Sequence, residues 1–272
     1  MLGVRPDGYH AIRTVMQTVS LYDRITFQSA DLLVVESPVR PKEEDLVLQA
    51  ARALERRGFA CPVKISVTKE IPEGAGFGGA SSDAAQVLLG LREMLHLPLS
   101  DGDLVDVAEE IGSDVPFFLT GGCALVEGRG EKVRRLRPIG EKRFLLLKPR
   151  SSLRTRDVFA HAVAGDGDRT ERLLRSLREG RFQLTGNDLE APARALLPSL
   201  DRLFENLEGL HPQLTGSGSA VFLEVRETEA QNLYERWRGR LFARLVESVP
   251  SVEEFRNGWA NPLGTGRQGL AY

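Results

Sequence analysis

The chain has 272 residues, of which 42% are hydrophobic and 27% are charged, and its formal net charge is −2. This length allows one large domain or two ordinary ones, and the composition is that of a soluble globular protein. The near-neutral charge excludes a strongly basic protein that would attract nucleic acid or an anionic membrane, so local dipoles and a few side chains must hold any anionic ligand.

Hydrophobic periodicity predicts helices and strands along the whole chain. Strands are expected at residues 15–19, 25–27, 63–68, 123–127, 132–136, 144–148 and 220–225. Helices are expected at residues 44–57, 81–95, 101–111, 156–162, 169–178, 189–206 and 228–246. Residues 138–142 read as a linker. We therefore predict two α+β domains, residues 1–140 and 141–247, and a variable tail, 248–272, that we expect to be poorly ordered.

Cysteine and histidine usage excludes further classes of protein. Cys61 and Cys123 are far apart and in no metal-ligand spacing, which argues against a disulfide framework and fits a reducing compartment. The four histidines form no i,i+4 pair that could hold a metal. No apolar run is long enough to span a membrane, and the chain does not start with a signal segment. We expect a cytoplasmic protein, and the sequence does not indicate its oligomeric state.

A glycine-rich loop joins the strand at 63–68 to the helix at 81–95. Its residues are Pro72, Glu73, Gly74, Ala75, Gly76, Phe77, Gly78, Gly79, Ala80, Ser81 and Ser82. Glycines let the backbone approach a ligand closely, and a helix start offers unpaired amides and a positive dipole end. Ser81 and Ser82 add hydroxyls, either as N-caps or as ligands to a phosphate or its magnesium ion. The loop is suited to holding a polyphosphate.

Three other interpretations compete with a polyphosphate loop. A plain turn with a serine N-cap would not need such a density of glycine. A dinucleotide site fits the spacing of Gly74, Gly76 and Gly79, but it needs a second strand where residues 101–111 have helical periodicity. A Walker loop needs a lysine after its last glycine, and Gly79 is followed by Ala80.

The remaining pattern, Pro-x-x-x-Gly-x-Gly-x-x-Ser-Ser, resembles the ATP loop of the GHMP kinases. Five further segments strengthen this resemblance: residues 5–10 (RPDGYH), 112–118 (GSDVPFF), 127–131 (EGRGE), 186–190 (GNDLE) and 215–219 (TGSGS). In this order, and up to about residue 246, the set is similar to one branch of the family, the 4-diphosphocytidyl-2-C-methyl-D-erythritol kinases of the non-mevalonate isoprenoid pathway.

The resemblance implies a fold and a reaction. The fold is the two-domain GHMP kinase fold, with a left-handed βαβ unit in the N-terminal ATP-binding domain and a ferredoxin-like C-terminal domain. In the reaction, ATP with Mg²⁺ donates its γ-phosphate to the tertiary 2-hydroxyl of the small-molecule substrate, CDP-methylerythritol. ATP would be held by residues 72–82, with Ser82 as a candidate magnesium ligand.

The resemblance also assigns roles to single residues. Asp114 matches the catalytic aspartate, which would accept the hydroxyl proton, although its local sequence alone favours a cap or turn. Tyr9 and His10 match a cytosine-binding pair; they could also simply belong to a hairpin turn. The other substrate-binding candidates are Phe159, a second stacking ring that could instead be core, and Gly216 and Ser217, which would shape the acceptor site or form a plain turn.

Two charged residues flank the loop. Lys69 lies three residues before Pro72, where the family often has a lysine, so it could reach a phosphate or be a solvated strand-end residue. Asp83 is expected to favour the positive end of the helix dipole and to do nothing more.

The chain departs from the family pattern at its front. It begins at Met1, beyond the strand in which the family carries Ala-Lys-Ile-Asn, and no residue here matches that lysine. A displaced start or a trimmed chain would account for this, and so would a true variant. We expect the chain as given to be weakly active or inactive, and equal turnover with and without a restored strand would refute this. Smaller departures are Ala80 in place of Gly and Phe77 in place of Leu.

Three alternative functions remain open. The first is another GHMP small-molecule kinase, of the homoserine or mevalonate type, against which Tyr9 and His10 argue because those substrates carry no base. The second is a non-catalytic nucleotide-binding variant. The third and most distant is an oxidoreductase.

Overall fold

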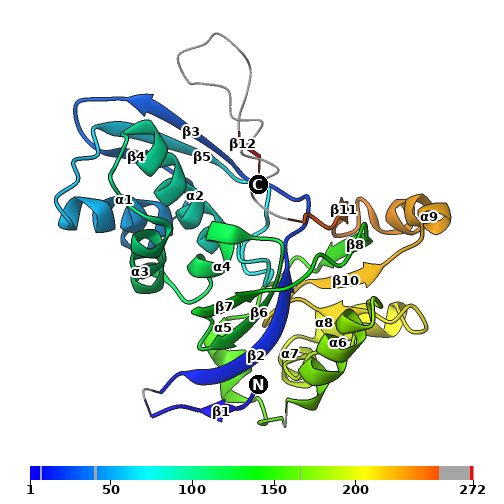
Figure 1. Ribbon diagram of the computed structural model, residues 1–272. Coiled ribbons are helices and arrows are strands. Elements are labelled where there is room, and N and C mark those ends of the chain that lie inside the picture. The colour runs from blue at the N-terminus through cyan, green and yellow to red at the C-terminus, as the bar shows by residue number, and fades with distance from the viewer. Residues whose placement is uncertain (7, 40–41, 166, 251–269, 272) are drawn as a thin grey trace.

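The computed structural model describes residues 1–6, 8–39, 42–165, 167–250 and 270–271. Its helices are η1 (Lys42–Glu44), α1 (Leu46–Arg56), α2 (Gly79–Met94), α3 (Asp101–Ile111), α4 (Val115–Thr120), α5 (Thr155–Ala160), α6 (Asp168–Arg178), α7 (Glu190–Leu196), α8 (Pro198–Asn206) and α9 (Glu227–Trp237). Its strands are β1 (Gly3–Val4), β2 (His10–Gln17), β3 (Arg24–Ser29), β4 (Val34–Glu36), β5 (Val63–Thr68), β6 (Cys123–Gly128), β7 (Lys132–Arg135), β8 (Arg143–Lys148), β9 (Gln213–Leu214), β10 (Val221–Glu224), β11 (Phe242–Glu247) and β12 (Leu270–Ala271). The long strand β2 runs between helices α1 to α4 on one side and α6 to α9 on the other (Figure 1).

Two four-stranded sheets contain the strands of the N-terminal half, together with β12 from the end of the chain. One has the order β12-β3-β5-β4, and α1 joins its parallel strands β4 and β5 into a βαβ unit. Asp45 caps the start of α1, because its carboxylate accepts a hydrogen bond from the amide of Val47. Apolar side chains of α1 and α2 pack with those of β3 and β5 in one buried core.

The second sheet of this half, β1-β2-β6-β7, is antiparallel throughout. The strands predicted at residues 123–127 and 132–136 are present as β6 and β7, and they pair as a hairpin. The turn between β1 and β2 is closed by a hydrogen bond from the amide of Arg5 to the carbonyl of Tyr9. This turn places Tyr9 and His10 at the start of β2.

The third sheet, β11-β8-β10-β9, contains only residues after position 140, and both of its faces are covered. Leu145 and Leu147 of β8 face a core formed with the helices α5, α7, α8 and α9. The alternate residue Leu146 faces the other way, toward Leu21 and Ile71 of the first half. The two halves thus meet through a sheet face, and we propose that the domain boundary lies near residue 140.

Two sequence predictions of helices were wrong. Residues 189–206 form two helices, because Pro198 has no amide hydrogen to continue the first and instead starts the second. Residues 228–246 end their helix at Trp237, where Gly239 with φ 80° turns the chain back. The following residues form β11 beside β8, because this pairing buries Ala243 and Val246.

Further differences concern the ends of elements and the tail. Helix α2 starts at Gly79, two residues earlier than predicted, and the short helix α4 was not predicted. Most of the tail, residues 251–269 and 272, lies outside the described residues, so the expectation about its order is not addressed.

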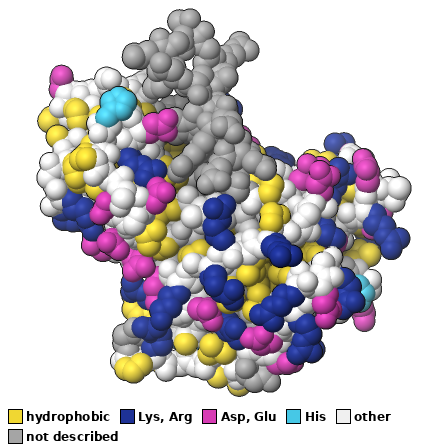
Figure 2. Space-filling model, viewed as in Figure 1, with side chains coloured by type: hydrophobic (Ala, Val, Ile, Leu, Met, Phe, Trp, Pro, Cys, Tyr) yellow, Lys and Arg dark blue, Asp and Glu magenta, His cyan; other side chains and the backbone are white. Residues whose placement is uncertain are grey.

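The surface carries charges of both signs. Basic and acidic side chains are interspersed on the face in Figure 2. Among the described residues, none of the helices is long and apolar enough to cross a membrane. The free thiols of Cys61 and Cys123 are both buried.

Candidate active site

Residues 72–82 run from β5 into α2, and their backbone conformation depends on glycine. Gly74, Gly76 and Gly78 have φ values of 59°, 74° and 72°, a region that other residues rarely adopt. A Cβ atom on Gly76 would lie 2.2 Å from the carbonyl oxygen of Thr215, so only glycine fits this close approach. Ala80 lies within α2 and has no positive φ, which explains why an alanine is accommodated there.

The start of α2 leaves amides free for a ligand. Gly78 occupies the N-cap position, where it has no side chain to cap the helix. The amides of Gly79, Ala80 and Ser81 donate to no acceptor in the part of the chain that the structure describes. The prediction that Ser81 or Ser82 is an N-cap is wrong, because the helix starts before them; Ser82 is instead buried in its first turns, with 6% of its surface exposed.

The loop at residues 215–219 packs directly on this glycine-rich loop. The Thr215 hydroxyl donates to the Ala75 carbonyl over 2.6 Å, and the Ser219 amide donates to the Gly74 carbonyl over 3.1 Å. Gly216 lies in the same contact, since a Cβ there would be 3.1 Å from the carbonyl oxygen of Gly76. The two loops therefore form one unit across the two halves of the molecule.

Asn187 and Thr155 hold the second loop from its other side. The Asn187 amide group donates to the carbonyls of Gly216 over 2.7 Å and Leu214 over 3.1 Å. The Thr155 and Ser217 hydroxyls are 2.9 Å apart. The sequence singled out residues 186–190 as a family motif but assigned them no role, and these hydrogen bonds supply one: they fix the backbone of residues 214–216.

Asp114 precedes α4 and lies beside the turn at residues 127–131. It occupies the N-cap position of α4 but makes no capping hydrogen bond, so the interpretation of a simple capping residue is wrong. A Cβ on Gly130 would lie 3.1 Å from its Oδ1 atom. One turn along α4, the ring of Phe118 would lie 2.7 Å from a Cβ on Gly78. Burial raises the pKa of Asp114.

The three aromatic candidates, Tyr9, His10 and Phe159, take part in two ring contacts. The rings of His10 and Phe159 are 4.9 Å apart, which joins β2 to α5. Tyr9 is 53% exposed, and the Arg129 guanidinium lies 5.4 Å from the centre of its ring. Because Arg129 adjoins Gly130, the Tyr9 ring and the Asp114 carboxylate lie on either side of the same turn, whereas the rings of His10 and Phe159 are partly buried.

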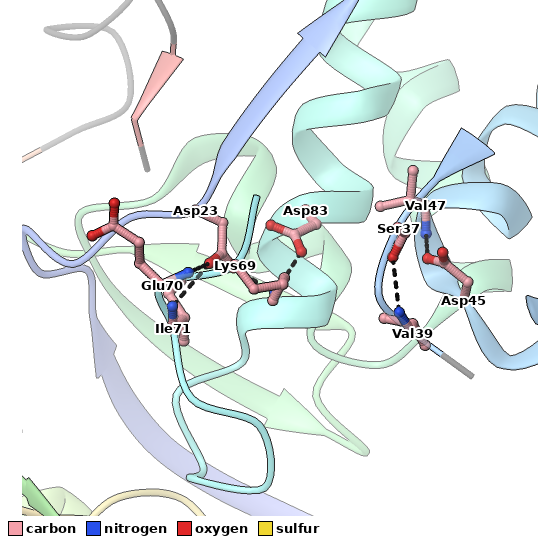
Figure 3. Close-up of polar contacts among 9 residues, drawn as sticks. All are labelled: Asp23, Ser37, Val39, Asp45, Val47, Lys69, Glu70, Ile71 and Asp83. Carbon is pink, nitrogen blue, oxygen red and sulfur yellow. Dashed lines mark hydrogen bonds and ion pairs between the residues drawn. The ribbon is translucent and has the colours of Figure 1, made fainter. Parts of the chain in front are cut away.

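A buried charged cluster beside the loop was missed by the sequence analysis (Figure 3). Lys69 donates to Asp23 over 2.5 Å and to Asp83 over 2.7 Å. The interpretation of Lys69 as solvated is wrong, because 14% of its side chain is exposed, and Asp83 does more than favour a dipole. These residues are far apart in the sequence, so no spacing pattern pointed to their pairing.

Comparisons with known proteins match both halves of the chain to models of one family. Residues 45–122 match the family described as GHMP kinases N terminal domain, and residues 159–243 match GHMP kinases C terminal. The 4-diphosphocytidyl-2-C-methyl-D-erythritol kinase of Acidovorax ebreus is 37% identical over 243 residues, covering 86% of this chain and 84% of its own. That of Carboxydothermus hydrogenoformans is 35% identical over 251 residues, covering 86% and 87%.

Solved structures show the same resemblance. A 4-(cytidine 5'-diphospho)-2C-methyl-D-erythritol kinase superimposes with a TM-score of 0.76 and 31% identity, covering 91% of this chain and 93% of its own. A mevalonate kinase superimposes with a TM-score of 0.64 at 14% identity, covering 90% and 93%, which shows a shared fold alone.

Proposed function

The chain belongs to the GHMP kinase family, and from this premise we propose that it transfers the γ-phosphate of ATP to the 2-hydroxyl of 4-(cytidine 5'-diphospho)-2-C-methyl-D-erythritol. This reaction is a step of the non-mevalonate pathway to isoprenoid precursors. One observation carries the proposal: α4 connects Asp114 to the glycine-rich loop through the contact of Phe118 with Gly78. A phosphate donor and a proton acceptor can therefore meet at one place.

The ATP triphosphate is assigned to residues 72–82. The free amides of Gly79, Ala80 and Ser81 form the first turn of α2, which is the positive end of its dipole and favours a bound anion. Such backbone donors suit a chain of net charge −2, which has no general attraction for a polyanion. Phosphoryl transfer depends mainly on positioning and charge stabilisation, and both are properties of such a loop.

Asp114 is assigned as the general base. Its carboxylate takes the proton of the 2-hydroxyl while the hydroxyl oxygen forms a bond to the γ-phosphorus. The bond from the γ-phosphorus to its bridging oxygen breaks, and ADP leaves with the electron pair. Burial raises the pKa of Asp114, so its carboxylate binds an incoming proton more strongly than an ordinary aspartate does. This supports its use as a base for a weakly acidic tertiary alcohol.

The cytosine base of the substrate is assigned to Tyr9, His10 and Phe159. An exposed ring such as that of Tyr9 can stack on a base, and the imidazole of His10 can hydrogen bond to its edge. Gly216 and Ser217 are assigned to the acceptor side, because their loop packs against the ATP loop. Homoserine and mevalonate carry no base, so these rings argue against kinases of those substrates.

Magnesium is assigned to the triphosphate, with Ser82 as the protein ligand. In the described ranges, no group of three His, Cys, Asp or Glu side chains could hold a metal ion by itself. Mg²⁺ commonly keeps its waters and binds through substrate phosphates with few protein ligands, so one hydroxyl fits this chemistry. When bound, the ion would neutralise charge on the phosphates.

We place the protein in the cytoplasm, which suits its two free thiols.

The direct test is ADP release measured with three acceptors. The purified protein is supplied with ATP, Mg²⁺ and CDP-methylerythritol, homoserine or mevalonate in separate reactions. We expect ADP with CDP-methylerythritol alone, at the low rate expected for the chain as given, and a phosphorylated product with the mass of one added phosphate. ADP release with homoserine or mevalonate, and none with CDP-methylerythritol, would overturn the substrate assignment.

A further inference from the structure

The cluster of Lys69, Asp23 and Asp83 joins three separate segments of the N-terminal half. Asp23 precedes β3, Lys69 follows β5 and Asp83 lies in α2. Asp23 and Asp83 are 3% and 4% exposed, and the Lys69 ammonium lies between their carboxylates (Figure 3). Burial alone would lower the pKa of Lys69, but the charges and hydrogen bonds of both carboxylates raise it, so this side chain stays cationic.

The cluster closes both ends of the glycine-rich loop. The second oxygen of Asp23 accepts hydrogen bonds from the amides of Glu70, over 2.6 Å, and Ile71, over 2.9 Å, immediately before Pro72. At the other end, Lys69 holds Asp83 in α2, and a Cβ on Gly79 would lie 3.5 Å from the Lys69 ammonium. The strand exit and the helix entry are therefore fixed to the same two carboxylates.

A loop of this composition needs fixed ends to bind tightly. Its glycines give it many conformations, and ordering them when a ligand binds reduces the affinity. Stability alone does not explain the cluster, because apolar residues in place of a buried ion pair are often equally stabilising. Its hydrogen bonds instead specify one geometry for the loop stem. The Lys69 ammonium is paired with two carboxylates inside this cluster.

We propose that Lys69, Asp23 and Asp83 form a staple that holds residues 72–78 in the conformation that binds ATP, with Lys69 as a positioning residue. This inference rests on the proposed function, because it takes the loop to be the ATP site. It differs from both sequence-based interpretations of Lys69, in which the lysine reached a phosphate itself or was a solvated strand-end residue.

The test removes the staple while keeping the local charge. The double variant Lys69→Met/Asp83→Leu removes one positive and one negative charge together, so no new net charge is buried. A matched control, Arg57→Met/Glu110→Gln, removes an ion pair from the same half of the molecule, at a distance of 2.5 Å but on the exposed surface. Calorimetry with a non-hydrolysable ATP analogue gives one dissociation constant, and calorimetry with CDP gives another.

We expect the staple variant to bind the ATP analogue about tenfold more weakly and CDP as the wild type does, because only the ATP loop loses its fixed ends. The control pair keeps both affinities. Unchanged affinity for the analogue would overturn the inference, and so would an equal loss for both ligands, which indicates general damage to the fold. Neither binding measurement needs phosphoryl transfer, so this test can be interpreted even if the acceptor assay fails.

A second measurement distinguishes a loosened loop from a general loss of stability in the variant. Hydrogen–deuterium exchange, well below the melting temperature of each protein, compares peptides from residues 70–82 with peptides from α1 and α3. We expect faster exchange in residues 70–82 of the staple variant and wild-type exchange in the two helices. Wild-type exchange in residues 70–82 would contradict the staple.

Discussion

The Thr215 hydroxyl donates a hydrogen bond of 2.6 Å to the carbonyl of Ala75, and this bond joins the C-terminal half to the glycine-rich loop. The same hydroxyl lies 3.0 Å from the carbonyl of Ala220, so it is shared between the two loops. Both carbonyls also accept a backbone amide, from Ala220 and Thr215 respectively. The hydroxyl thus reinforces a contact that the backbone already makes.

Thr215→Val is therefore expected to loosen this contact without breaking it. The valine has nearly the same shape, and the two carbonyls keep their backbone partners, so we expect a loss of about 1 kcal/mol in the free energy of unfolding. Urea denaturation measures this loss, and Thr215→Ser, which keeps the hydroxyl, is the control. Equal stability of the valine variant and the wild type would show that the hydroxyl contributes nothing.

Gly76→Ala is expected to be much more damaging than a glycine substitution elsewhere. The added Cβ would lie 2.2 Å from the Thr215 carbonyl oxygen. The substitution would also place an alanine at φ 74°, which favours glycine. Gly58→Ala is the matched control, because Gly58 has φ 87° and no atom within 4 Å of the added Cβ. The control should lose about 1–2 kcal/mol from the backbone alone. Gly76→Ala should melt well below it, and equal melting temperatures would contradict the close packing.

The fold was predictable wherever short-range patterns and tertiary contacts agree. The strand at 63–68 and the helix at 101–111 have the bounds that their periodicity predicted. At residues 242–247 the two disagree. The apolar spacing there also suits a helix, but pairing with β8 makes the segment a strand. Local sequence carries no information about that partner strand.

The site was predictable in part for a related reason. Residues 72–82 form a motif that is continuous in the sequence, and the resemblance to a family pointed to Asp114. Lys69 and Asp83 are fourteen residues apart, and Asp23 is forty-six residues before Lys69. Their pairing requires β3, β5 and α2 to be packed first. A buried ion cluster of this kind can be recognised only from the tertiary structure.

Phe159→Leu is expected to weaken binding of the cytosine-containing substrate alone. The ring lies 4.9 Å from that of His10, and leucine keeps apolar bulk there but removes the aromatic face. Stacking of a base on an aromatic side chain contributes about 1–3 kcal/mol, so we expect at least a roughly fivefold rise in KM for CDP-methylerythritol. KM for ATP should not change. A proportional change in both constants would show that Phe159 acts through the fold and does not stack on the base.

Asp114→Asn is expected to abolish turnover and to stabilise the protein. The asparagine cannot accept the hydroxyl proton, so we expect kcat to fall at least about a hundredfold, while ATP still binds. The effect on stability follows from the raised pKa of Asp114. As the pH rises above about 3.9, the aspartate ionises first in the unfolded chain. Stability is therefore lost until the pH passes the folded pKa, and the deficit then stays constant.

The measurement is a comparison of unfolding free energies from urea denaturation at several pH values. The asparagine variant should be more stable than the wild type at neutral pH, and the difference should shrink as the pH falls through the folded pKa of Asp114 toward the ordinary range. The wild-type kcat/KM should decline on the acid side at a higher pH than an ordinary aspartate would give, because the same carboxylate must be ionised to act as a base. An asparagine variant that is less stable at neutral pH would show that Asp114 serves the fold, and full activity in that variant would exclude it as the base.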